Sequence, residues 1–406
     1  MTTTQSTHTQ VNGADSAPAA ALALPDPRSI HNLAQIALDA LRMLPPAYGC
    51  SIFGLPNTWL PPHRRFSEFG ILNLWRPLRA AKFIQHTLLP SAPRTPPTFA
   101  PPALNDFFWQ PSVILQRPDH YGSYTSFPEE AWFFINGVMT DDAVAQVNAA
   151  LLAELFHRPI TLIQNSTSSL LTDLLQCALD KQGWRITEPV TKAMPAVYAA
   201  LKRPDKHRVV VIAHSQGTII AAVLLQLLKQ ITRPAAARRG LAGPPAYAPP
   251  EFVYPDESPL VLTDFAPLTE AELGKLEIYC FATCANTMTH YRPASQEKPA
   301  LPYLEHFGNE RDIVARLGMQ APHAAERGIQ IDGLRFVRPG AWGHLLNEHY
   351  LYPLADSQRQ GRRKGGSGGA APFVPAGDTQ QPATPRLYAY INGGAPEEKI
   401  DRGFGG

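Results

Sequence analysis

Short apolar runs alternate with stretches of helical spacing between residues 131 and 351. The run Val209-Val210-Val211-Ile212 is continuous and β-branched, which is typical of a strand buried on both faces of a parallel sheet. Other strand-like runs occupy residues 131–138, 159–164, 276–284, 301–307 and 329–337. This alternation predicts an α/β fold with a doubly wound, mostly parallel sheet, flanking helices and right-handed crossovers.

Four segments between these strands have helical spacing. The segment 218–231 (TIIAAVLLQLLKQI) is apolar nearly all round, so we expect this helix to be deeply buried. The segment 141–156 has Asp141 or Asp142 as its candidate N-cap. The two remaining helical segments are 168–179 and 191–201.

Changes in composition divide the chain into parts. Pro totals 41 and clusters at 90–102, 232–260 and 361–385, which is typical of connectors and loops. We therefore predict a disordered N-terminus (1–26), an N-terminal helical and Pro-rich extension (27–128), an α/β domain (129–354) with a candidate lid insertion (232–275), and a flexible Gly/Pro-rich C-terminal segment (355–406).

Charge and cysteine usage narrow the classes of partner. Lys plus Arg total 36 and Asp plus Glu total 34, and a net charge of +2 does not favour a nucleic-acid partner. The four cysteines are too few for a disulfide framework, and we expect Cys280 and Cys284 to pack in an apolar run rather than bind metal. The sequence has neither a Gly-rich phosphate loop nor a metal-spaced His/Cys/Asp cluster, so no cofactor and no metal are expected.

One segment of the chain has features that suit a membrane surface. The sequence lacks a secretory signal pattern and any run of about 18 apolar residues, so we expect a cytoplasmic protein with no spanning helix. Residues 58–90 combine Trp59, Trp75 and Phe66 with several arginines, which suits a helix on a membrane surface. Packing of this segment on the α/β domain is the favoured alternative, and Pro77 predicts a kink.

The strongest local signal is Ala213-His214-Ser215-Gln216-Gly217, between the buried strand and the apolar helix. A serine hydroxyl is a weak nucleophile, so it must be exposed beside a base. A sharp strand-to-helix turn lifts it above the carboxyl edge of the sheet, and the tight backbone needs small residues such as Ala213 and Gly217. Ser215 is therefore the candidate nucleophile, the alternative being a packed turn with an incidental serine.

With these residues the chain resembles the α/β-hydrolase superfamily, in its lipase- and esterase-like branch, from about residue 131 to residue 351. Ala213 departs from the glycine that the family most often has at that place. The resemblance implies a catalytic domain whose triad follows the order serine, acid, histidine, preceded here by the N-terminal extension that the composition predicts.

Asp312 is the candidate acid, because it follows the strand expected at 301–307 and can orient an imidazole. Glu310 is its nearest rival, whereas Asp264 and Asp332 do not lie just past the corresponding strand. Asp312 can alternatively cap the helical turn that follows it.

His344 is the candidate base, because it follows the last predicted strand and the preceding glycine suits a tight loop back to the serine. His349 is expected inside a helix in a structural role, and His214 is expected to be a packing residue.

Two backbone N–H groups are candidates for an oxyanion hole. The Gln216 N–H lies at the start of the helix after the nucleophile, whose dipole favours developing negative charge. By the resemblance, Asn136-Gly137-Val138 stands where the family often has a His-Gly motif, with the Val138 N–H as second donor and Asn136 in place of His. The alternative is an ordinary Asn-Gly turn at the end of a strand.

The segment 232–275 mixes a Pro/Ala loop with a capping-box pattern at Thr269 and Glu272. A lid over an apolar pocket and an inert surface loop both fit it.

Together these features predict a serine hydrolase that cleaves a carboxylic ester, with a lipid ester as one candidate substrate, through an acyl-serine intermediate. The partner is then a small ester molecule, and no obligate protein partner is evident. Thioesterase, amidase and acyltransferase chemistry use the same parts. A catalytically silent α/β-hydrolase scaffold that binds a small ligand or a protein is the alternative of another class.

Overall fold

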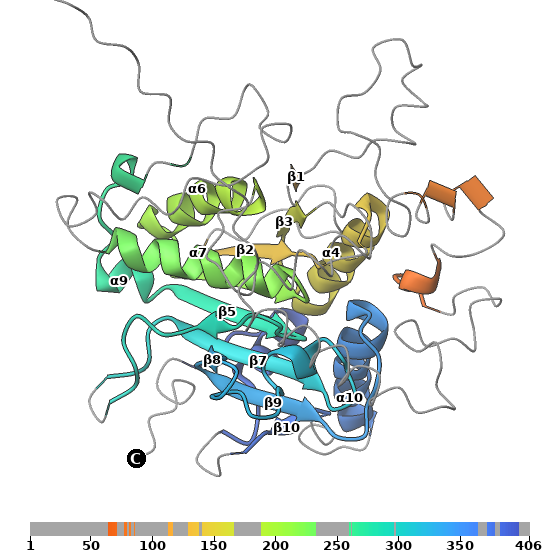
Figure 1. The fold of residues 1–406 in the computed structure, drawn as a ribbon. Helices are drawn as coiled ribbons and strands as arrows, with labels where there is room; N and C mark the ends of the chain where they lie inside the picture. Colours follow the sequence, from red (N-terminus) through yellow and green to blue (C-terminus); the bar gives the residue numbers. More distant parts are fainter. Residues whose placement is uncertain are drawn as a thin grey trace, which may run out of the picture.

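A central β-sheet organises the part of the chain that the computed structural model describes (Figure 1). That part comprises residues 64–70, 77–78, 81–82, 85, 113–116, 129–137, 140–165, 188–232, 260, 262–295, 298–363, 372–377 and 382–397. The sheet has eight strands in the order β1-β3-β2-β4-β5-β7-β9-β10. Their bounds are β1 Val113–Gln116, β2 Glu130–Ile135, β3 Ile160–Asn165, β4 Arg208–His214, β5 Leu276–Phe281, β7 Tyr303–Asn309, β9 Leu334–Arg338 and β10 Val374–Pro375.

The inner strands from β3 to β9 run parallel, and the edge strands β1 and β10 are antiparallel to their neighbours. A second, two-stranded parallel sheet pairs β6 (Thr287–Met288) with β8 (Gln330–Ile331). The mostly parallel α/β sheet predicted from the sequence is therefore present. In a parallel sheet all carboxyl ends lie at one edge, so residues just past β4, β7 and β9 are brought near one another.

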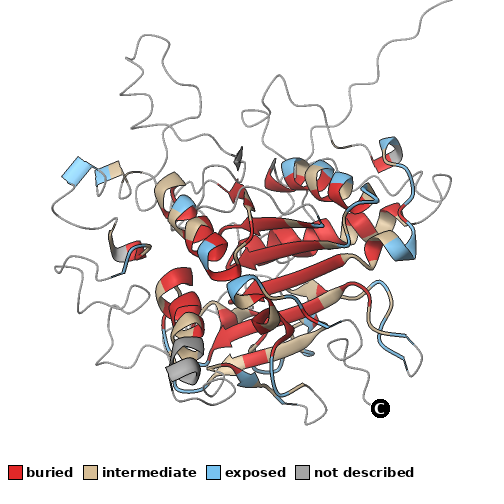
Figure 2. Ribbon diagram, turned by 180° about the vertical axis from the view of Figure 1, so that it is seen from behind, coloured by how far each residue is buried: buried red, intermediate tan, exposed pale blue. Residues whose placement is uncertain are grey.

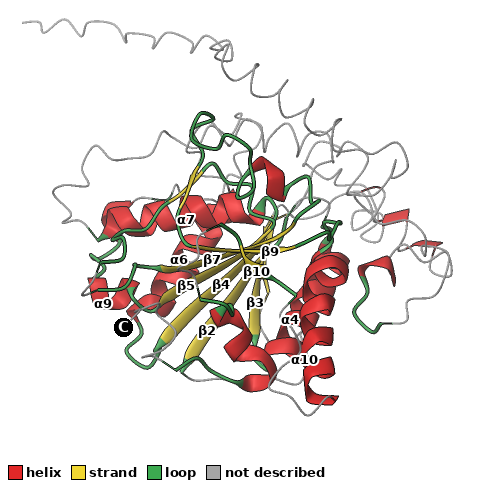
Figure 3. Cartoon of the chain, turned by 90° about the horizontal axis from the view of Figure 1, so that it is seen from below, coloured by secondary structure: helices red, strands yellow, loops and turns green. Residues whose placement is uncertain are grey.

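Helices cover both faces of the sheet, as Figure 3 shows, with α6 and α7 on one side and α4 and α10 on the other. The four helices are α4 Asp142–Phe156, α6 Glu188–Lys202, α7 Gly217–Ile231 and α10 Tyr352–Arg363. Along β4, Val209 and Val211 pack in the cluster with α6 and α7, whereas Val210 and Ile212 pack in the cluster with α4. This period-two alternation between two apolar layers explains why the strand is continuous in hydrophobic residues. The inner strands of the sheet are largely buried, as Figure 2 shows.

Local sequence signals explain where several elements begin. Asp141, rather than Asp142, caps α4, because its side chain accepts a hydrogen bond of 2.9 Å from the Val144 N–H. The capping box of Thr269 and Glu272 is present at α9 (Glu270–Leu273). The helix expected at 168–179 lies outside the described residues.

The strand expected at 329–337 is two strands. β8 ends at Ile331 in the small sheet, and β9 begins at Leu334 in the large one. Gly333 lies between them at φ +104°, where a Cβ would lie 2.6 Å from the Leu304 Cβ. The chain turns sharply at this glycine, which a count of apolar residues does not reveal.

Part of the C-terminal segment expected to be flexible is packed on the domain. Helix α10 extends to Arg363, and the 3₁₀ segment η7 (Arg386–Gly393) packs beside α4. Within η7, Arg386 donates to Glu277 at 2.9 Å, and Tyr390 donates to the same carboxylate at 2.6 Å. Because these charged and aromatic groups satisfy one another in a buried place, the segment is anchored despite its Pro- and Gly-rich surroundings. Residues 364–371 lie outside the described part.

The N-terminal extension contacts the domain through residues 64–70, which include the 3₁₀ turn η1 (Glu68–Gly70). Arg64 pairs with Asp356 of α10 at 2.9 Å, and the Phe66 N–H donates to the Tyr352 hydroxyl at 3.1 Å. The buried Glu68 carboxyl group accepts from the N–H groups at residues 347 and 348, at 3.1 and 3.2 Å. These two residues follow Leu346, the first residue of the π-helical turn η6 (Leu346–Leu351), so the extension holds the start of the segment that leads into α10.

Most of 58–90 lies outside the described residues, so the membrane contact of that segment stays a prediction. Among the helices that the structure describes, none has the length and apolar character that crossing a bilayer requires. Of the candidate lid, residues 233–259 and 261 lie outside the described part. The rest includes the 3₁₀ turn η4 (Leu262–Asp264) and α9, which packs on α6 through a Lys202–Glu272 ion pair of 3.0 Å.

Glu68 predicts a specific pH dependence of stability. Burial, the largest influence, raises the pKa of its carboxyl from 4.5 to about 8, although hydrogen bonds from backbone N–H groups lower it. The folded chain therefore keeps a proton that the unfolded chain has lost, and this contribution to stability declines as pH rises from about 4.5 to about 8. Glu68→Gln keeps the shape and removes the titration.

We expect Glu68→Gln to gain stability over wild type as pH rises through this window, by up to about 1.4 kcal/mol for each pH unit. Urea unfolding at a series of pH values measures the difference. Glu326→Gln, at an exposed position, is the matched control and should track wild type. Parallel stability curves for wild type and Glu68→Gln would contradict the buried, protonated carboxyl.

Candidate active site

Ser215 lies at a strained turn between β4 and α7. Its φ is +56°, in the left-handed region that non-glycine residues rarely adopt. The turn is held by backbone contacts, because the Ser215 N–H donates to the Phe281 carbonyl at 3.0 Å. The Ser215 carbonyl in turn accepts from the Thr218 hydroxyl at 2.7 Å and from the Cys284 thiol at 3.3 Å. These bonds fix the serine backbone in a conformation that costs about 1–3 kcal/mol.

Close steric contacts explain why the residues around Ser215 are small. A Cβ on Gly217 would overlap the Ile135 carbonyl oxygen at the end of β2. A Cβ on Gly137 would overlap the Ser215 Cβ and lie 3.0 Å from the Ser215 Oγ. Ala213 is fully buried in the cluster that contains α7. The turn after β2 and the turn after β4 therefore touch each other, and only small residues allow it.

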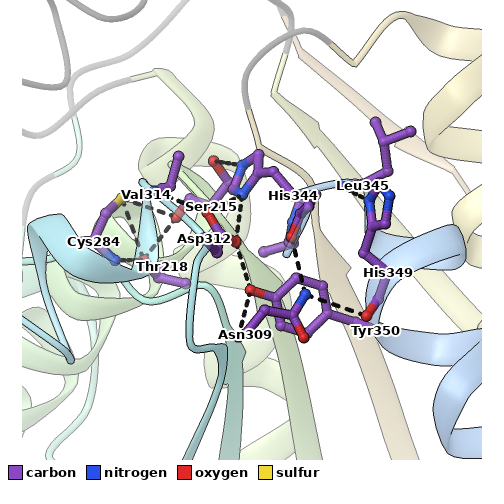
Figure 4. Close-up of polar contacts among 12 residues, drawn as sticks. Ser215, Thr218, Cys284, Asn309, Asp312, Val314, His344, Leu345, His349 and Tyr350 are labelled. Carbon is purple, nitrogen blue, oxygen red and sulfur yellow. Dashed lines mark hydrogen bonds and ion pairs between the residues drawn. The ribbon is translucent and has the colours of Figure 1, made fainter. Parts of the chain in front are cut away.

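His344 links the serine to an acid (Figure 4). Its Nε2 lies 2.9 Å from the Ser215 Oγ, and its Nδ1 lies 2.9 and 3.1 Å from the two carboxylate oxygens of Asp312. Because a carboxylate accepts, the Nδ1 carries the proton, and the Nε2 is left to accept from the serine hydroxyl. The structure thus brings together the three residues that the sequence proposed for the triad, from loops that follow three different strands.

Asp312 is buried and has four hydrogen-bonding contacts. Besides the two with His344, its carboxylate accepts from the Tyr350 hydroxyl at 2.5 Å and from the Val314 N–H at 2.8 Å. Burial is the largest influence and raises its pKa, but the charge of His344 and these bonds outweigh it, so that the pKa lies below its ordinary value. Asp312 therefore caps the following turn and also orients the imidazole.

The other carboxylates that were considered lie elsewhere. Glu310 accepts from the Gly340 N–H. Asp332 accepts from the His290 N–H at 3.0 Å. Asp264 is exposed in η4. Asp312 is the one among these candidates whose carboxylate is within hydrogen-bond distance of the His344 ring.

The loop that carries His344 is shaped by His349. Gly343 has φ +96°, and a Cβ there would overlap the His349 ring. The Nδ1 of His349 accepts from the Leu345 N–H at 2.9 Å, which closes the loop around the ring. Asn309 then holds the loop from β7 by donating to the Gly343 carbonyl at 2.9 Å. His349 thus has the structural role expected of it, and burial lowers its pKa to about 4.

A buried amide network connects the two loops proposed for an oxyanion hole. Asn165, the last residue of β3, donates from its side chain to the Gln216 Oε1 at 2.7 Å. Its backbone N–H donates to the Asn136 Oδ1 at 2.7 Å, and the Asn136 Nδ2 donates back to the Asn165 carbonyl at 2.8 Å. The Gln216 N–H lies at the start of α7, where the first N–H groups have no acceptor within the helix. Val138 lies outside the described residues.

Asn165 and Tyr350 are site residues that the sequence analysis did not identify. Asn165 carries a weak signal, since it is a polar residue at the carboxyl end of a predicted parallel strand. Tyr350 carries none, because a tyrosine in the segment Leu346–Leu351 is equally typical of packing. The two described cysteines, Cys280 and Cys284, are buried free thiols, in line with the packing role expected of them.

A hollow of about 450 Å³ lies at the opposite, amino-terminal edge of the sheet, where its lining includes the start of β7. Two ion pairs lie in its lining, Arg292 with Glu270 and Arg386 with Glu277. Ser215 follows the carboxyl end of β4, so this hollow is separate from the candidate site.

Comparisons with known proteins add little. No protein-family model matches the chain, and no curated protein matches it. Among solved structures, it is similar to a hyperthermophilic esterase from the archaeon Pyrobaculum calidifontis, with 13% identity and a TM-score of 0.26 over 62% of this chain and 82% of that chain. A TM-score of this size does not establish a common fold. The function proposed below therefore depends on the geometry of the site.

We expect Gly137→Ala to lower activity by more than its loss of stability can explain. The added methyl group would displace the Ser215 side chain, and a misplacement of about 1 Å at reacting atoms can cost about 100-fold in rate. Ester turnover and thermal unfolding of the variant are measured together. Gly328→Ala is the control, because its Cβ meets no atom within 4 Å, and it should affect stability without affecting turnover. Unchanged turnover in Gly137→Ala would contradict the contact.

Proposed function

We propose that the protein is a serine hydrolase of the α/β-hydrolase fold that cleaves carboxylic esters through an acyl-serine intermediate. The continuous hydrogen-bond chain from Asp312 through His344 to the Ser215 Oγ carries this proposal. Such a chain has the donor and acceptor roles needed to activate a hydroxyl toward an acyl carbon. Two further features support it: the strained turn at Ser215, and the chain order of the three residues.

The geometry assigns a role to each group in acylation. As the Ser215 oxygen attacks the ester carbonyl carbon, the His344 Nε2 takes the serine proton, and Asp312 stabilises the imidazolium that forms. The carbonyl oxygen gains negative charge and is stabilised by the Gln216 N–H and the α7 dipole. Collapse of the tetrahedral intermediate breaks the bond to the alcohol oxygen, which takes the proton from His344 and leaves.

Deacylation repeats these steps with water. His344 removes a proton from a water molecule, which attacks the acyl carbon, and the proton then returns to the Ser215 oxygen as the carboxylic acid leaves. The tautomer imposed by Asp312 is required in both halves, because the Nε2 must begin as an acceptor. A silent scaffold that binds a ligand has no need of this tautomer or of the serine–histidine distance.

Substitution of the three residues tests the proposal. We expect Ser215→Ala and His344→Gln to lower kcat for p-nitrophenyl esters by about 10⁴-fold or more, because each removes a group that acts in every step. Asp312→Asn should also lower kcat strongly, since an amide can stabilise the wrong tautomer of His344. A panel of esters of increasing acyl length, assayed with purified wild type, shows which chain the site accepts.

Ser295→Ala is the matched control, since Ser295 is exposed and bonds within its own turn at Lys298. It should retain wild-type turnover. Serine-independent turnover, or a folded wild type that hydrolyses no ester in the panel, would contradict the proposed function.

A further inference from the structure

His214 immediately precedes the proposed nucleophile and contacts the proposed base. Its Nε2 lies 2.8 Å from the backbone carbonyl oxygen of His344, and the side chain is buried. A carbonyl oxygen only accepts, so the Nε2 carries the proton and donates it. The two imidazole rings lie against each other, with centroids 4.7 Å apart and planes tilted by 31°.

This bond joins two loops that are distant in sequence. The serine and the base are 129 positions apart, and the sheet places their loops side by side without fixing the exact separation. The loop around His344 is held at its start by Asn309 and by its own turn around His349. His214 is the group among the described contacts that holds the carbonyl of His344 itself, from the residue next to Ser215.

The surroundings keep His214 in one protonation state. The pKa of His214 is lowered from 6.5 to about 3, chiefly by burial and next by the nearby charge of His344. Asp312 acts in the opposite direction, and His349 adds to the lowering. The rings of His214 and Tyr350 are in an edge-to-face arrangement, with centroids 6.1 Å apart. His214 therefore stays a neutral donor while His344 gains and loses its proton.

We propose that His214 is a positioning residue that sets the distance between the nucleophile and the base through its hydrogen bond to the His344 carbonyl. This inference rests on the proposed function. It assigns to the position before the serine a task that a packing residue does not have. Rotation of the His344 peptide would swing the imidazole, and small errors at that distance are costly to the rate of attack.

Two amide substitutions separate the hydrogen bond from the ring. His214→Gln places a side-chain N–H near the position of the histidine Nε2, whereas the shorter amide of His214→Asn ends near the position of Nδ1. Both variants lack the imidazole, so the difference in kcat between them measures the effect of the hydrogen bond to the His344 carbonyl. We expect His214→Asn to lower kcat about 10- to 100-fold with KM within about twofold, and His214→Gln to recover most of the loss.

Kinetics of both variants are measured beside wild type and Ser215→Ala on the same ester. Equal kcat in the Asn and Gln variants would overturn the positioning role and leave the proposed function intact. Wild-type turnover that does not depend on Ser215 would instead overturn the proposed function. The two failures are therefore distinguishable.

A measurement on wild type tests the bond even if His214→Asn fails to fold. Histidine ¹⁵N shifts and ring protons, followed by NMR between pH 5.5 and 8 with His214→Gln used to assign the signal, report its tautomer. We expect a neutral, Nε2-protonated ring that does not titrate in this range. An Nδ1-protonated ring, or one that titrates there, would overturn the inference.

Discussion

The hydrogen bond between the Ser215 Oγ and the His344 Nε2 is the interaction on which the rest of the site depends. It joins the turn after β4 to a loop after β9, and the bond from His214 to the His344 carbonyl holds the same two loops together. The parallel sheet makes the approach possible by placing the carboxyl ends of its strands at one edge. Asp312, beyond β7, then fixes the imidazole from the other side.

Holding this bond requires unfavourable backbone geometry. Ser215 is a non-glycine residue at φ +56°, and Gly343 is at φ +96° with no room for a side chain. The cost is offset locally, because the carbonyl of Ser215 accepts from Thr218 and Cys284. Backbone strain that is held in place by surrounding contacts is a common feature of functional sites.

The sequence predicts those parts of the molecule whose structure is determined by residues close to one another in the chain. The continuous apolar run of β4 and the small Gly217 follow from burial and close approach, so the turn at Ser215 could be located from its neighbours. Asp312 and His344 required chain order as well as pattern. Asn165 and the contact of His214 could not be predicted, because each depends on how side chains from separate segments meet.

The C-terminal segment shows a second limit of prediction from sequence. Its composition predicts flexibility, yet η7 is anchored by the Arg386–Glu277 pair and by Tyr390. The composition of a segment is an average over all its residues, so it does not reveal the few that pair with buried charges. The sheet, by contrast, is predictable because many apolar positions repeat its pattern.

Covalent labelling tests the central claim most directly. The folded protein is treated with a fluorophosphonate, digested, and mapped by mass spectrometry, with urea-unfolded protein treated in parallel. A nucleophile activated by His344 and Asp312 predicts one phosphonyl adduct, on the Ser215 Oγ, that forms in the folded protein and not in the unfolded one. An adduct at another residue, or none in the folded protein, would contradict an activated serine at this site.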